Sequence, residues 1–186
     1  MANKVFTHYY DSLACSMRDV DALREWIRGQ DVVVDNDTCQ RTILHDATKI
    51  RQEGDFLISR DEDRLHLCFS QEEVITVPDG VRSIAAGAFT HKYCPNVRHI
   101  ILPESVDGIS PYAFCCDRLN QISVNNKYVY ISDAAFEIGH EDLAIHMMEE
   151  FTYIVTNDSD GLQVVKQMPY SEYSSYVYAK QNDLPF

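Results

Sequence analysis

Residues 74–103 read VITVPDGVRSIAAGAFTHKYCPNVRHIILP, and the overlapping stretch 100–124 reads IILPESVDGISPYAFCCDRLNQISV. The second stretch repeats the apolar pattern of the first at an offset of 25 residues. The recurring pairs are Pro78 and Pro103, Val81 and Val106, Ile84 and Ile109, Ala88 and Ala113, and Phe89 and Phe114. A repeat of this length is one supersecondary unit, which buries its apolar face against its own copy. The pattern therefore predicts a solenoid, a fold that usually presents an extended surface for binding macromolecules.

Each unit has a short apolar segment before its proline, at V-x-x-I-x-L in one copy and L-x-x-I-x-V in the next. Proline ends a strand because it has no N–H to donate to the ladder. After it, an Ile-x-x-x-Ala-Phe ridge follows, and we expect Phe89 and Phe114 to stack at equivalent sites. The sequence predicts one small parallel sheet with these inward residues: Ile75, Val77, Val97, Ile100, Leu102, Leu119, Ile122 and Val124.

These units resemble the BspA-like, treponemal-type leucine-rich repeat, which reads roughly Ile-Pro-x-x-Val-x-x-Ile-x-x-x-Ala-Phe-x-x-Cys-x-x-Leu-x-x-Ile-x-Ile. Cys94 before Val97 and Cys116 before Leu119 match the family's Cys-x-x-Leu spacing. Residues 125–136 resemble the closing unit of the family, because Phe136 falls 22 residues after Phe114. The stretch DFLISRDEDRLHLCF resembles its opening hairpin. The resemblance covers residues 55–136 and implies a protein that binds other proteins through its repeat surface.

Residues 1–54 are interpreted as a helical N-terminal cap. Apolar residues at three- and four-residue steps predict a helix over 9–29, VVVDND (32–37) is extended, and 42–50 is helical again. Over residues 10–48 this segment resembles an ankyrin repeat. The matching residues are Asp19, Leu23, Gly29, Asp31, Val32, Thr42, Leu44, His45 and Ala47.

Residues 137–186 are interpreted as an acidic C-terminal cap. EDLAIHMMEEF (141–151) predicts an amphipathic helix, and residues 152–168 predict a β-hairpin with Asp158–Gly161 at its tip. A tyrosine-rich tail follows, which either packs on the fold or offers a partner surface. The expected fold class is α+β: a short leucine-rich-repeat solenoid with a helical N-terminal cap and a helix-plus-hairpin C-terminal cap.

The charge of the chain limits the classes of partner. Its net charge is −13, and residues 137–186 hold 9 acidic and only 2 basic residues. Such a surface repels phosphates, so we expect no direct binding of nucleic acid or anionic membrane. The sequence shows no signal peptide, and its six cysteines have no disulfide-framework spacing. We therefore expect reduced thiols and a cytoplasmic protein.

The sequence offers candidate residues for a zinc site and for a calcium loop, and it can be searched for catalytic signatures. His91, Cys94, His99, Cys115 and Cys116 contain zinc-ligand types, but Cys94 and Cys116 are explained as small buried residues of the repeat. Asn157–Gly161 has calcium-type residues, but position 167 is Gln where an EF-hand needs Glu, so a turn is favoured. The sequence contains no signature of a nucleophile elbow, Walker loop, dinucleotide fold or zinc protease.

We therefore expect a non-enzymatic binding protein without a cofactor or metal. The expected partner is a protein, bound through the repeat sheet at Thr76, His99, Ile101, Gln121 and Ser123 or, where its surface is basic, through the acidic residues Glu137, Glu141, Asp142, Glu149 and Glu150. Two alternatives stay open. The chain is an acidic inhibitor that mimics nucleic acid in the groove of a basic protein, with Asp158 and Asp160 also contributing, or it is an enzyme with an unrecognised site.

Overall fold

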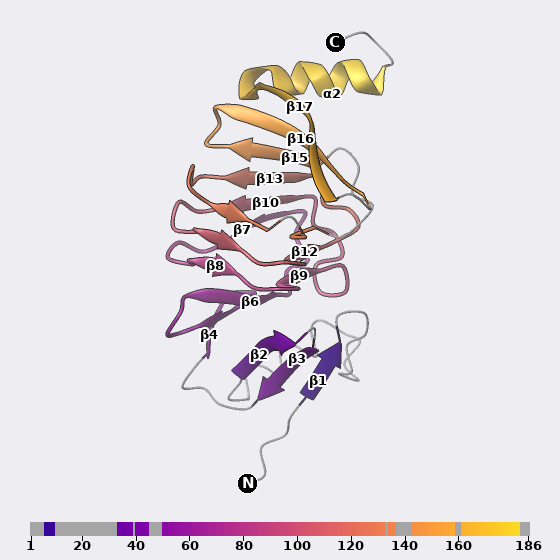
Figure 1. The fold of residues 1–186 in the computed structure, drawn as a ribbon. Coiled ribbons are helices and arrows are strands. Elements are labelled where there is room, and N and C mark those ends of the chain that lie inside the picture. Colours follow the sequence, from indigo (N-terminus) through magenta and orange to yellow (C-terminus); the bar gives the residue numbers. More distant parts are fainter. Residues whose placement is uncertain are drawn as a thin grey trace.

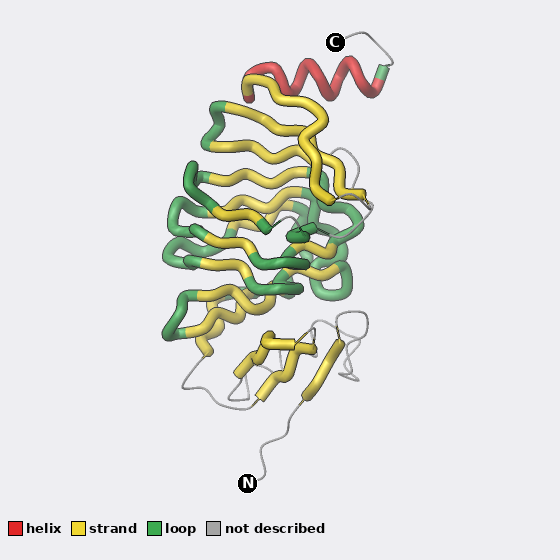
Figure 2. Tube along the Cα trace, viewed as in Figure 1, coloured by secondary structure: helices red, strands yellow, loops and turns green. Residues whose placement is uncertain are grey.

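A computed structural model describes residues 6–9, 33–38, 40–44, 50–132, 134–136, 143–158 and 161–182. From Ile50 onward the described chain forms a short β-solenoid of about three turns, followed by one C-terminal helix. Successive turns lie on top of one another (Figure 1), and green corners alternate with yellow strands in each turn (Figure 2). The predicted solenoid is therefore confirmed.

The first sheet carries the strands that lead to the repeat prolines. Its parallel members are β7 (Val74–Thr76), β10 (His99–Leu102), β13 (Gln121–Val124) and β15 (Leu143–Met147). Two antiparallel strands extend it, β16 (Phe151–Asp158) and β17 (Gly161–Pro169). The predicted parallel sheet is confirmed, but it continues beyond the predicted repeats.

Further strands form the other sides of the solenoid. The second sheet contains β4 (Ile50–Glu53), β5 (Phe56–Ser59), β6 (Arg64–Cys68), β8 (Ser83–Ile84), β11 (Gly108–Ile109) and β14 (Tyr130–Ile131). The third side pairs β9 (Phe89–Thr90) with β12 (Phe114–Cys115). The predicted opening hairpin is confirmed, since β5 and β6 pair in antiparallel orientation.

The core lies between these sheets and consists of repeated side chains in register. Phe89 and Phe114 stack with ring centroids 5.5 Å apart, and Phe114 and Phe136 stack at 5.4 Å. All eight residues predicted to face inward from the first sheet are at most 3% exposed. Because each turn places the same residue type at the same site, the apolar surface of one turn is covered by the next.

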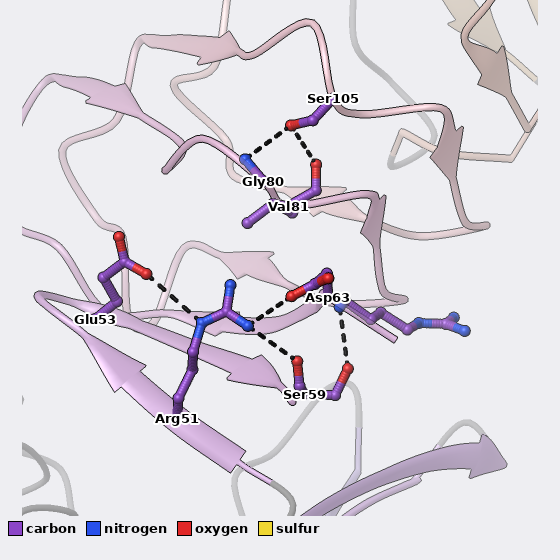
Figure 3. Close-up of polar contacts among 8 residues, drawn as sticks. Arg51, Glu53, Ser59, Asp63, Gly80, Val81 and Ser105 are labelled. Atoms are coloured by element: carbon purple, nitrogen blue, oxygen red, sulfur yellow. Dashed lines mark hydrogen bonds and ion pairs between the residues drawn. The ribbon is translucent and has the colours of Figure 1, made fainter. Parts of the chain in front are cut away.

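Polar corners align the turns at the solenoid's edge. The hydroxyl of Ser105 accepts a hydrogen bond from the amide of Gly80 (3.1 Å) and donates one to the carbonyl of Val81 (2.8 Å), as Figure 3 shows. One turn later, the amide group of Asn126 donates to the carbonyl of Val106 at 3.0 Å. Each corner therefore uses a side chain of the following turn to satisfy its backbone groups.

The start of the solenoid has its own polar contact. The guanidinium of Arg51 on β4 lies 2.7 Å from a carboxylate oxygen of Asp63 and donates to the carbonyl of Ser59 (Figure 3). Glu53 forms a longer ion pair with the same guanidinium, at 3.6 Å. The contacts of Arg51 to Ser59 and Asp63 join β4 to the hairpin of β5 and β6.

The predicted helix over 141–151 is wrong, because residues 143–147 form strand β15 and residues 151–158 form β16. The pattern LAIHM also fits alternation, and β15 pairs in parallel with β13, so that Ile145 continues the buried row of Ile122. A tight turn then reverses the chain, with Met148 and Glu149 at φ values of 52° and 57°. An α-helix cannot contain two residues in that left-handed region.

The predicted helical N-terminal cap is not supported where the structure describes it. The described segments are three strands, β1 (Phe6–Tyr9), β2 (Val33–Thr38) and β3 (Gln40–Leu44), with β3 in the centre of their sheet. The helix predicted over 42–50 is therefore wrong at Thr42–Leu44, where two β-branched residues favour a strand. The helix predicted over 9–29 lies outside the described residues, except for Tyr9, which belongs to β1.

The C-terminal cap contains the predicted hairpin and an unpredicted helix. Strands β16 and β17 pair from Asp158 and Gly161 at the tip to Phe151 and Pro169 at the base. A short 3-10 helix, η1 (Tyr170–Glu172), leads into α2 (Tyr173–Gln181) at the C-terminal end of the stack (Figure 1). The helix of this cap therefore lies in the tyrosine-rich tail and not before the hairpin.

We predict that Phe114→Ala lowers the free energy of unfolding by about 3–5 kcal/mol, because it opens a cavity between two stacked rings. Tyr128→Ala is the matched control, since its ring is 79% exposed, and its effect should stay within about 0.5 kcal/mol. Urea unfolding followed by circular dichroism measures both variants. A similar small effect of the two substitutions would contradict a stacked phenylalanine core.

Candidate protein-interaction surface

The first sheet presents a face to the outside because side chains alternate along each strand. Its residues on β7, β10 and β13, here called the outward face, include all five sheet residues predicted from the sequence. Thr76 is exposed and the other four are partly exposed. The outward face also includes Val74, which is 53% exposed and which the sequence reasoning missed. The residues of the outward face are Val74, Thr76, His99, Ile101, Gln121 and Ser123.

Strand register arranges these residues in two rows across the sheet. Ile101 stands between Thr76 and Ser123, and the row continues to His146 on β15. The other row begins at Val74 and continues through His99 and Gln121 to Ala144. The same alternation that buries Ile75 could have identified Val74 from the sequence. His146 was not predicted to be a sheet residue, because its strand was interpreted as a helix.

The outward face has no charged side chain at neutral pH. His99 is its one titratable residue, and burial lowers the pKa of its imidazole below the usual value of 6.5. Its Nε2 lies 2.8 Å from the hydroxyl oxygen of Ser123, which positions the ring across two strands. The face therefore offers apolar groups and neutral hydrogen-bonding groups.

Beyond β13 the same side of the sheet is covered by the C-terminal segment. Ala144, Ile154 and Met168 are buried there and pack against Tyr173 and Tyr176 of α2. The tail therefore packs on the fold through these two tyrosines, while Tyr170 and Tyr178 are exposed by 40% and 62%. Helix α2 divides the sheet into a covered part and the outward face.

A pocket of about 320 Å³ lies where α2 meets the sheet. It is lined by Asn120 and Ile154 and by five residues of α2: Tyr173, Tyr176, Val177, Lys180 and Gln181. Neither His99 nor His146, the histidines whose pKa values are lowered, lines this pocket. Its walls instead combine apolar surface with amides and one ammonium group.

The acidic candidates are only partly described. Glu149 and Glu150 are exposed in the turn between β15 and β16. Glu137, Glu141, Asp142 and Asp160 lie outside the described residues, and Asp158 ends β16. The structure therefore places one acidic pair on the surface, at the strand end next to the covered part of the sheet.

Four cysteines among the described residues lie in the core. Cys68, Cys94, Cys115 and Cys116 are buried thiols, and the thiol of Cys94 donates to the carbonyl of Cys68 at 3.2 Å. Burial raises the pKa of the Cys68 thiol well above its usual value. Among the residues that the structure describes, no group of three or more His, Cys, Asp or Glu side chains is arranged to hold a metal ion.

Comparison with protein families matches residues 66–157 to the BspA type leucine rich repeat region, in six copies. Residues 66–157 are therefore BspA-type leucine-rich repeats, and the predicted resemblance is confirmed there. The predicted ankyrin resemblance has no support from any comparison. No curated protein matches the chain, and no solved structure does.

Leucine-rich repeat domains are generally protein-interaction modules and are typically not catalytic. Within the described part of the chain, no helix is long and apolar enough to cross a membrane.

We predict that His99 titrates below pH 6.5, because partial burial disfavours the imidazolium form. Heteronuclear NMR of the imidazole carbon-bound protons measures the midpoint directly, and His99→Asn assigns the signal. A midpoint at or above 6.5 would contradict the expectation that the outward face is uncharged throughout the neutral range.

Proposed function

We propose that this chain is a non-enzymatic interaction module that binds a protein partner through the outward face. One observation carries the proposal: a chain with a net charge of −13 keeps this strip of parallel sheet free of charged side chains. Val74 and Ile101 are apolar residues on that strip; Val74 is 53% exposed and Ile101 is partly exposed. An uncharged patch of this kind, surrounded by a charged surface, is typical of the centre of a protein interface.

The acidic surroundings add to this proposal. Glu72 and Glu73 are exposed directly before β7, where Glu73 pairs with Arg98 at 3.9 Å, and Glu149 and Glu150 are exposed beyond β15. Carboxylates at the rim of an interface accelerate association with a basic partner but add little affinity. The partner that fits best has an uncharged centre and a basic rim.

The second candidate function is the acidic inhibitor that occupies a nucleic-acid-binding groove. The observation that favours it is the exposed carboxylate pair at Glu149 and Glu150. In this case the acidic residues and not the outward face would provide the affinity, and binding would depend strongly on salt.

We predict that Ile101→Arg weakens partner binding at least about 10-fold, because a charge at the centre of an interface loses its hydration without gaining a partner. The partner is captured from native lysate with the wild-type chain, identified by mass spectrometry and titrated against each variant. Val164→Arg is the matched control, since Val164 is 60% exposed on β17, away from the outward face.

The same titration separates the two functions. Loss of binding in Ile101→Arg, with little effect of Val164→Arg, supports the outward face. Loss of binding at 0.5 M salt and in the double variant Glu149→Lys with Glu150→Lys, but not in Ile101→Arg, supports the acidic inhibitor and refutes the outward face as the binding site.

A further inference from the structure

His146 is a titratable side chain enclosed beneath the C-terminal segment. It lies on β15 on the covered side of the first sheet and is 2% exposed. Its Nδ1 is 2.9 Å from the hydroxyl oxygen of Thr152 on β16. The rings of Tyr170 and Tyr173 meet the imidazole edge-on, with centroids 5.1 Å and 4.7 Å away. The imidazole is therefore closed in by residues of η1 and α2.

The groups that face His146 include no anion among the described residues. From β10, the ring of His99 approaches it edge-on at a centroid distance of 6.2 Å. Strand β13 contributes the hydroxyl of Ser123 as its register neighbour, and β16 contributes Thr152. From the C-terminal segment come the two tyrosines, and burial raises the pKa of Tyr173, which keeps its hydroxyl neutral.

Three charged side chains of the C-terminal cap have other surroundings. The ammonium of Lys166 on β17 lies over the ring of Tyr176, 4.7 Å from its centroid. Lys180 lines the pocket beside α2, and Glu172, the last residue of η1, is exposed. An imidazolium at position 146 would therefore be buried without a carboxylate to neutralise it.

The segment that covers His146 is lightly attached. Ala179 is the one buried residue of α2, and η1 has none. Tyr173 and Tyr176 are partly buried, and a backbone hydrogen bond from the amide of Tyr170 to the carbonyl of Glu150, at 3.0 Å, ties η1 to the turn below it. A segment with so few buried groups opens locally at a lower free energy than the core of a structure does.

We propose that η1 and α2 form an acid-released cover of the first sheet and that protonation of His146 releases it. A proton on the imidazole creates a buried, unpaired cation, which is stabilised when the cover lifts and water reaches the ring. Release uncovers Ala144, Ile154 and Met168, of which Ala144 adjoins the outward face at Gln121 and Ile154 follows it on β16. The inference that release enlarges the binding face rests on the proposed function. The inference that the cover is released does not.

The direction of the pH dependence follows from the surroundings of His146. Burial, and then the neighbouring His99, lower its pKa to about 4, compared with about 6.5 for a hydrated imidazole. The released state therefore binds the proton more tightly than the covered state. The stability of the cover is complete above pH 6.5, decreases as the pH falls from about 6.5 toward about 4, and changes no further below that range.

Hydrogen–deuterium exchange of the full chain tests the release. Amides of residues 173–181 should be protected at pH 7.5 and should lose protection about 30-fold at pH 5.0, after correction for the intrinsic exchange rate. Amides of β10 and β13, in the middle of the solenoid, should keep their protection at both values of pH. Loss of protection in all segments together would indicate global unfolding and would overturn the proposal.

Two variants identify the trigger. His146→Asn keeps a polar group near the position of Nδ1 for the hydrogen bond to Thr152 but cannot take up a proton, so its α2 should exchange equally at both values of pH. His91→Asn is the matched control, since His91 is 64% exposed and lies on another side of the solenoid, and it should behave as the wild type does. A release that persists in His146→Asn would overturn the proposal, as would protection of α2 in the wild type down to pH 4.5.

If His146→Asn does not fold at pH 7.5 by circular dichroism, the wild type decides the question alone. Its His146 imidazole signal, followed by NMR, must then titrate together with the loss of protection in α2. Separate midpoints would refute the trigger. These measurements need no partner, so a failure of the outward face in the binding assay leaves their result unaffected.

Discussion

The fold depends on the stacking of equivalent side chains between successive turns. A single turn of this chain has only a few apolar residues on its inner side, too few to form a core of its own. In register, Ile75, Ile100, Ile122 and Ile145 form one continuous buried row, and three phenylalanines form another. Parallel backbone pairing and side-chain burial therefore stabilise each other, because both require the same alignment of the turns.

This alignment also produces the surface. A strand that directs every second residue into the core must direct the others outward, so the rows of the outward face are as regular as the buried rows. The turn sequence varies at these outward positions, with Thr, Ile and Ser in one row and Val, His and Gln in the other. A stacked solenoid can thus change its binding face without changing the residues that support it.

The end of the stack has a different physical requirement. The last parallel strand, β15, has an edge whose backbone groups need partners; β16 supplies them in antiparallel orientation, and β17 pairs in turn with β16. Helix α2 then covers the apolar side chains that these strands expose on the outer side. As a consequence, His146 of β15 is enclosed by two tyrosines and a second histidine. The described groups that face it include no anion.

The sequence predicted the repeats, the inward residues of the first sheet, the phenylalanine stack and the C-terminal hairpin, because these features depend on periodicity and on turn residues that recur along the chain. It did not predict β15, since LAIHM fits both a strand and a helix and the following turn contains Met148 and Glu149 in place of Asn or Gly. Helix α2 was also missed, although Tyr173, Tyr176 and Ala179 follow at three-residue steps.

The local pattern therefore determined which residues face the core within each repeat. Tertiary contacts decided the conformation of residues 143–147 and the burial of His146, because an open strand edge selects a strand where periodicity leaves two choices. The position of α2 likewise follows from the apolar surface left on the sheet, and no segment of the sequence contains that information before the turns are stacked.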